Sequence, residues 1–191
     1  MPGPPVNNTS QNGVTRPQGA HCDIGSYELP MTTLTLQSVG TKDGWILESL
    51  ETSGVGGTMN VNGQAIVLGD DSVDKQYRSI LHFNTASLPD NAVITKVTIK
   101  VKKKAIFGTD PFTTHQYIKV DIKSGSFSNN PALQLTDFQS AASKNWIGTI
   151  KNTPISGWYS TVLKNMAFPY INLTGATQFR LYFALDDDND T

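Results

Sequence analysis

The sequence predicts an all-β fold, a two-sheet antiparallel β-sandwich of jelly-roll-like topology with an irregular N-terminal arm. Two observations predict it. Several short segments alternate apolar and polar residues with a period of two, as half-buried strands do. Residues that favour turns separate these segments at the spacing typical of sandwiches and barrels.

Two of the expected strands, 77–83 and 92–103, are joined by a proline-containing turn. In the second strand the odd-numbered residues from 97 to 101 are apolar and the residues between them are polar, so one face is expected in a core and the other in water. The first strand alternates less cleanly, because Ile80 falls on the face of Arg78 and His82.

The remaining strands follow from the same reasoning, and a helix of about two turns is expected to begin at Thr136. The clearest alternation lies at 117–123, where three β-branched residues alternate with charged ones. The other expected strands are 33–39, 44–48, 64–68, 155–163 and 178–185.

The length of 191 residues predicts one sizeable domain, residues 31–191, preceded by an extended arm or linker, residues 1–30. The arm is rich in proline and has no periodicity, so alone it lacks the apolar content to fold. Its run GVTRPQGAHCDIGSYE at 13–28 resembles the C-terminal end of secreted parallel β-helix domains.

Composition excludes several classes of protein. Charged residues make up 16% of the chain, against a typical ~25%, and polar uncharged residues replace them, which suits an extracellular module. The net charge of −1 argues against nucleic acid as a partner. No apolar run approaches the ~20 residues of a membrane span. The single cysteine, Cys22, excludes an internal disulfide.

A family resemblance rests on three runs: LGDD at 68–71, YRSILHFN at 77–84 and SLPDNAVITKVT at 87–98. Their order and spacing resemble the DNRLRE family, which comprises β-sandwich modules of secreted and cell-surface bacterial and archaeal proteins, related to carbohydrate-binding modules. The resemblance implies an extracellular or cell-surface location and a carbohydrate-binding-like role in attachment or adhesion.

The sequence contains no motif of a known catalytic machinery. The three histidines are His21, His82 and His115. His82 is expected to be a structural histidine, and nothing near His115 in the sequence resembles an activated nucleophile. Two carboxylates from different strands could still converge as a glycosidase pair. We expect a non-catalytic protein.

Two acidic clusters are candidates for a structural calcium ion, which binds 6–8 oxygen ligands in typical sites. The alternative is a solvated acidic tail. The candidate metal ligands are Asp70, Asp71 and Asp74 in one cluster and Asp186, Asp187, Asp188 and Asp190 in the other.

The candidate ligand-binding residues are Trp146, Tyr159 and His115. Trp146 stands in a polar setting and is the best candidate for an exposed ring that stacks on a sugar. The basic run that includes Lys100 and Lys102–Lys104 is expected to be a solvated strand face that discourages pairing between sheet edges.

The sequence therefore predicts attachment to a glycan or to other subunits of the same protein. The alternative function is that of a structural subunit of an extracellular filament or surface assembly. In that case the N-terminal arm of one subunit would pair with an open sheet edge of the next, as in β-strand addition, and build a homopolymer.

Overall fold

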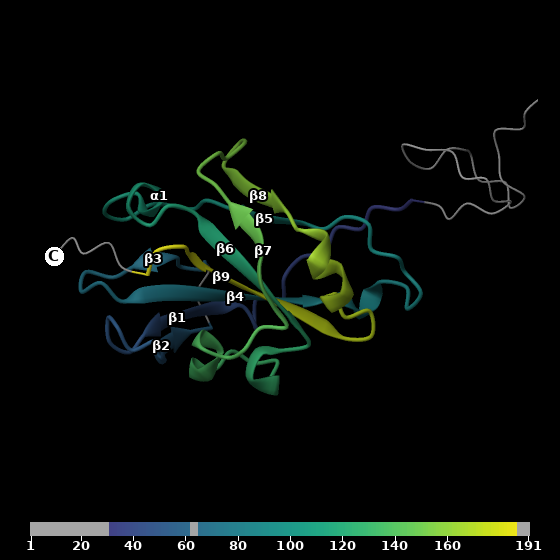
Figure 1. Cartoon of the computed structure of the whole chain (residues 1–191), viewed down its shortest axis with the longest axis horizontal. Coiled ribbons are helices and arrows are strands. Elements are labelled where there is room, and N and C mark those ends of the chain that lie inside the picture. Colours follow the sequence, from purple (N-terminus) through teal and green to yellow (C-terminus); the bar gives the residue numbers. More distant parts are fainter. Residues whose placement is uncertain (1–30, 62–64, 187–191) are drawn as a thin grey trace, which may run out of the picture. The chain divides into compact units, whose positions relative to one another are not determined.

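The computed structural model describes residues 31–61 and 65–186 (Figure 1). Contacts divide the chain into two units, Met1–Thr35 and Leu36–Thr191. In the first unit, residues 31–35 are exposed and have no regular secondary structure. All strands and helices of the described ranges lie in the second unit, and they confirm the all-β fold with its two antiparallel sheets.

The large sheet has seven strands in the order β2-β1-β4-β9-β6-β7, with β3 pairing with β4 as well. Its strands are β1 (Gly44–Glu48), β2 (Gly56–Asn60), β3 (Gly69–Asp70), β4 (Gln76–Asn84), β6 (Ile118–Ser124), β7 (Lys144–Ile150) and β9 (Ala176–Phe183). The small sheet pairs β5 (Thr98–Lys102) with β8 (Trp158–Val162).

The helices are short. They are α1 (Pro111–Thr114) and the 3-10 helices η1 (Thr85–Ser87), η2 (Phe127–Asn129), η3 (Leu135–Phe138) and η4 (Asn165–Tyr170). Pro111 lies at the start of α1, where its missing N–H costs nothing, and Asp110 caps the helix by accepting the N–H of Phe112.

The main core lies between the two sheets. Alternate residues of the central strands and of the small sheet fill it, as period-two strands require. Among its most buried members are Ile99, Val120, Ile122, Ile150, Leu163, Leu181 and Phe183. The sheets approach closely at Gly148, where a Cβ atom would lie 2.8 Å from Cδ2 of Leu163.

A second, smaller core covers part of the other face of the large sheet, which we call its outer face. The segment 125–143, with η2 and η3, folds over this face and buries Phe127 and Phe138 completely. Ile80 faces this second core, together with Ile46 and Leu133. Both faces of β4 are therefore buried, which explains why Ile80 shares a face with polar residues.

Arg180 of β9 fastens the segment 125–143 to the sheet. One guanidinium nitrogen donates to the carbonyl oxygens of Asp137, Phe138 and Ser140 at 3.0, 3.1 and 2.8 Å. The other terminal nitrogen forms an ion pair with Asp121 at 2.8 Å, and both side chains are buried. A buried charge is tolerated when it is paired and hydrogen-bonded in this way.

Several sequence expectations are confirmed. Strand 44–48 is β1, and 77–83, 117–123, 155–163 and 178–185 correspond to β4, β6, β8 and β9 with shifted ends. The strands expected at 77–83 and 92–103 both form, as β4 and β5. They lie in different sheets, and the second shrinks to Thr98–Lys102, the length of its partner β8.

Other expectations are wrong. Residues 33–39 form no strand, and the N–H of Val39 makes one backbone hydrogen bond to the carbonyl of His82. Of the strand expected at 64–68, residues 65–68 are irregular, because β9 occupies most of that side of β4 and leaves room only for Gly69–Asp70. The helix at Thr136 is a single 3-10 turn, Leu135–Phe138.

Two strands, β2 and β7, were not expected from the sequence. The jelly-roll topology stays a prediction. The N-terminal arm, residues 1–30, on which the filament hypothesis rests, lies outside the described residues.

Candidate binding face

The backbone at Trp146 departs from regular β geometry. The register between β6 and β7 shifts between Val120 and Ile122, so β7 bulges, and Trp146 has a φ of 49°. A positive φ is uncommon for a residue with a large side chain. Two side chains hold the backbone of Trp146 on either side of its Cα atom. Asp121 Oδ1 accepts the Trp146 N–H at 2.8 Å, and Lys164 Nζ donates to the Trp146 carbonyl at 3.0 Å.

Asp121 is a fixed acceptor. Its carboxylate is fully buried and is already paired with Arg180 at 2.8 Å. The hydroxyl of Tyr182 donates to the same carboxylate at 3.3 Å. Burial, followed by the negative charge of Asp121, raises the pKa of Tyr182 to about 12, so this hydroxyl keeps its proton and stays a donor.

The Trp146 ring lies over the outer face of the large sheet and is 44% exposed. It is nearly parallel to the ring of Tyr117, with an interplanar angle of 13° and centroids 6.2 Å apart. Its indole N–H donates to Thr149 Oγ1 at 2.9 Å. The ammonium groups of Lys164 and Lys119 lie 4.5 and 5.8 Å from its centroid.

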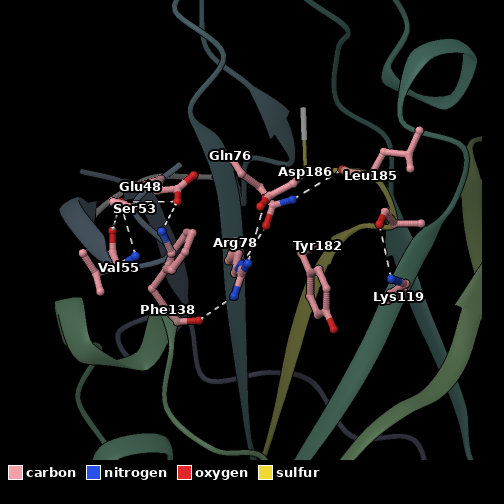
Figure 2. A network of polar contacts seen from close by, with 12 residues as sticks. Glu48, Ser53, Val55, Gln76, Arg78, Lys119, Phe138, Tyr182, Leu185 and Asp186 are labelled. Carbon is pink, nitrogen blue, oxygen red and sulfur yellow. Dashed lines mark hydrogen bonds and ion pairs between the residues drawn. The ribbon is translucent and has the colours of Figure 1, made fainter. Parts of the chain in front are cut away.

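Cations and aromatic rings continue to alternate across the sheet. Lys119 of β6 lies 5.9 Å from the ring centroid of Tyr182 of β9, and the guanidinium of Arg78 of β4 lies 5.1 Å from it on the next strand. Figure 2 shows Tyr182 between these two side chains. We call Trp146, Lys119, Tyr182 and Arg78 the outer row. The row ends where Arg78 covers the ring of Phe138 at 4.0 Å.

The Arg78 end of the row is held by its own contacts (Figure 2). Arg78 Nε donates to the side-chain oxygen of Gln76 at 2.6 Å, and Nη1 donates to the carbonyl of Phe138 at 3.0 Å. Asp186 lies 4.0 Å from Nη2 with its side chain 56% exposed. Burial, and then the charge of Arg180, lowers the pKa of Arg78.

Glu48 lies beside this network on β1, 1% exposed. Its Oε1 accepts hydrogen bonds from the Gly54 N–H and from the hydroxyl of Ser53. Its Oε2 has no hydrogen-bond partner within the described ranges. The charge of Glu48 acts on the pKa of Arg78 in the direction that favours the charged guanidinium, against the larger effects of burial and of Arg180.

Tyr159 does not offer a ring face to a ligand in this structure. It points into the core, is 5% exposed and stacks on Phe112 with an interplanar angle of 20°. Its hydroxyl donates to Asn152 at 3.3 Å. The exposed aromatic residue of β8 is its neighbour Trp158, at 45%.

His115 is also buried, 1% exposed, and it contacts one of the expected metal ligands. Its Nε2 lies 3.0 Å from Asp70 Oδ2, and its Nδ1 lies 2.6 Å from the hydroxyl of Thr114. This contact ties the short strand β3 to the turn after α1. Two residues that the sequence placed in different candidate sites are therefore partners of each other.

The other expected calcium ligands either have contacts within the chain or lie outside the described residues. Asp71 accepts the N–H groups of Val73 and Lys75 and pairs with the Lys75 ammonium at 3.3 Å. Burial alone would raise its pKa, but these contacts hold the pKa below its ordinary value. Asp74 is buried with a φ of 60°.

Asp186 faces Arg78, whereas Asp187, Asp188 and Asp190 lie outside the described residues. In residues 31–61 and 65–186, no three His, Cys, Asp or Glu side chains gather closely enough to hold an ion. Calcium stays a prediction.

Three members of the outer row were missed in the sequence, namely Lys119, Tyr182 and Arg78. The alternation of β6 and β9 does place Lys119 and Tyr182 away from the main core. Nothing in the sequence shows that these two and Arg78 stand side by side, because their strands are far apart along the chain and become neighbours only in the folded sheet.

Comparison of the chain with family models, with curated proteins and with solved structures finds no match. The DNRLRE resemblance therefore stays a prediction. Among the described helices, none combines the length and the apolar character needed to cross a membrane.

Proposed function

We propose that this protein is a non-catalytic extracellular module that attaches to a glycan through the outer row and Tyr117. The observation that supports this proposal most strongly is the backbone conformation of Trp146. Asp121 and Lys164 hold this residue at a φ of 49°, so that its large ring lies half-exposed on a strand of the sheet. Strained backbone that its surroundings hold in place is characteristic of binding sites.

The chemistry around the ring supports a sugar ligand. Rigid aromatic side chains supply contact area at low entropic cost, and the parallel pair Trp146 and Tyr117 provides two ring planes with one orientation. Polar groups next to the rings fix the orientation of a ligand. Lys119 and Lys164 supply cationic donors at the ring, and Thr149 supplies a hydroxyl.

The test is binding of the purified chain to a panel of immobilised polysaccharides and oligosaccharides. Wild-type protein should bind at least one glycan class, and Trp146→Ala should lose that binding at least about tenfold, the effect of removing a central aromatic contact. Trp158→Ala is the matched control, because Trp158 is equally exposed but lies on the small sheet.

Near-ultraviolet circular dichroism and thermal unfolding should show that both variants remain folded. Equal loss in the two variants, or binding that survives in Trp146→Ala, would contradict the proposal.

A further inference from the structure

A second exposed surface lies on the outer side of the small sheet, across the main core from the outer row. The outward residues of β5 and β8 form three cross-strand pairs, Thr98–Val162, Lys100–Ser160 and Lys102–Trp158. A shallow groove there is lined by Lys100, Ile155, Trp158 and Ser160. Trp158 is 45% exposed, Ile155 is 78% exposed, and Lys102 Nζ lies 5.9 Å from the Trp158 ring.

The loop that leaves β5 at the same end of the sheet carries exposed apolar residues. Residues 103–109 are all exposed, and Phe107 is 92% exposed at its tip, next to Ile106 at 40%. The Lys103 N–H donates to the carbonyl of Gly157 at 2.9 Å, which ties the start of the loop to the turn between Ile155 and Trp158. Two apolar projections therefore flank one end of the small sheet.

The charged residues of β5 and of the loop 103–109 are all lysines. Neither 91–109 nor 138–185 contains an Asp or Glu. The first acid beyond the loop, Asp110, accepts the Phe112 N–H and the Asn152 side-chain amide. The lysines beside the projections are Lys100, Lys102, Lys103 and Lys104. We call these four lysines with Ile106, Phe107, Ile155 and Trp158 the basic end.

We propose that the basic end docks on the surface of a lipid bilayer that contains anionic headgroups. Exposed apolar side chains at a loop tip enter the boundary between headgroups and acyl chains, tryptophan rings settle at that depth, and lysines bind the lipid phosphates. The four lysines favour an anionic partner. Phe107, which is 92% exposed, favours a partner with an apolar interior. This inference concerns a different face from the proposed glycan site and does not depend on it.

The experiment measures sedimentation of the full chain with vesicles of phosphatidylcholine alone and of phosphatidylcholine mixed with phosphatidylglycerol. Wild-type protein should bind the mixed vesicles, less at high salt because exposed charges are screened. Lys104→Glu should weaken binding by well over about fivefold, the effect of removing one lysine near an anionic surface. Lys144→Glu makes the same charge change at an exposed position on β7 and should have little effect.

Insertion distinguishes a membrane from a soluble polyanion. Phe107→Ser should weaken vesicle binding about as strongly as Lys104→Glu, and its high exposure means that the fold is preserved. Brominated lipids should quench the fluorescence of Trp146→Phe, which retains Trp158, but not the fluorescence of Trp158→Phe. Trp146→Ala should lose glycan binding only, so failure of one proposal leaves the other standing.

The proposal is overturned if wild-type protein does not bind the mixed vesicles, or if Phe107→Ser binds them as tightly as wild type. It is also overturned if heparin or single-stranded DNA binds with the same dependence on Lys104 but none on Phe107. That last outcome would indicate a purely electrostatic surface.

Discussion

The carboxylate of Asp121 accepts the backbone N–H of Trp146 at 2.8 Å, and Trp146 has a φ of 49°. This contact joins the buried interior of the large sheet to its most exposed aromatic ring. Because Asp121 is held in turn by Arg180, the position of the ring depends on a residue of β9 and on the segment 125–143 that Arg180 fastens.

Removal of the Asp121 carboxylate should destabilise the fold strongly. Asp121→Ala leaves a buried guanidinium without its anion, which costs about 3–5 kcal/mol. Chemical denaturation should show this loss in the free energy of unfolding. Asp186→Asn is the control. The Asp186 carboxylate lies 4.0 Å from the Arg78 guanidinium, and its side chain is more than half exposed. The free energy of unfolding of Asp186→Asn should therefore stay within about 1 kcal/mol of wild type.

The backbone conformation of Trp146 can be tested by comparing two substitutions. Glycine adopts a positive φ without steric cost, whereas alanine keeps the Cβ atom that crowds the carbonyl oxygen. Both variants lose the ring. Trp146→Gly should therefore be more stable than Trp146→Ala by about 1 kcal/mol, measured as the free energy of unfolding. Equal stability, or a more stable alanine variant, would contradict the assigned conformation.

The close packing of the two sheets predicts a severe effect at Gly148. A Cβ atom there would lie 2.8 Å from Leu163 and 3.1 Å from Thr161, so Gly148→Ala should cost about 1–3 kcal/mol through overpacking. Gly40→Ala is the matched control, because no atom lies within 4 Å of a Cβ at that position. If the two variants unfold alike, β7 does not pack beneath β8 as described.

Protonation of His82 should make stability depend on pH. His82 is 3% exposed, and its Nδ1 lies 3.1 Å from the side-chain nitrogen of Gln178, whose oxygen already accepts the Phe127 N–H. Burial, and then the charge of Lys42, lowers the pKa of His82 in the folded state. The histidine is thus held as a neutral acceptor.

Linkage between protonation and folding sets the direction in which stability changes with pH. The unfolded chain binds the proton more readily, so the contribution of His82 to stability is complete above the unfolded pKa of about 6.5 and falls as the pH drops toward the folded pKa. The free energy of unfolding of His82→Asn, whose amide oxygen can accept the same hydrogen bond, should vary less between neutral and mildly acidic pH than that of wild type. An unchanged slope would contradict the neutral state.

Removal of calcium with a chelator tests the predicted metal sites. If the cluster 186–190 or the loop 70–74 holds the ion, excess chelator should lower the melting temperature, because loss of a ligand of the native state destabilises it. Added magnesium should not restore it, since magnesium demands a tighter octahedral site. A melting curve unchanged by chelator removes calcium from the description of this fold.

The sequence predicted the fold class well because alternation reports directly on a two-sided strand. Alternation predicted less well the strands that are covered on both faces, or whose two faces carry similar residues. Ile80 disturbed the pattern because both faces of β4 are buried. In β8 both faces carry an aromatic residue, so alternation could not tell that Tyr159 points inward and Trp158 outward. In β7 the bulge at Trp146 breaks the period.

Nuclear magnetic resonance of the three indole N–H groups tests the central claim most directly. The chain has three tryptophans, and Trp146→Phe and Trp158→Phe assign their signals. Titration with the glycan selected by the binding panel should shift the Trp146 indole signal and leave those of Trp45 and Trp158 in place. A titration that shifts only Trp158, or no indole signal while the glycan is bound, would contradict a binding site on the outer face of the large sheet.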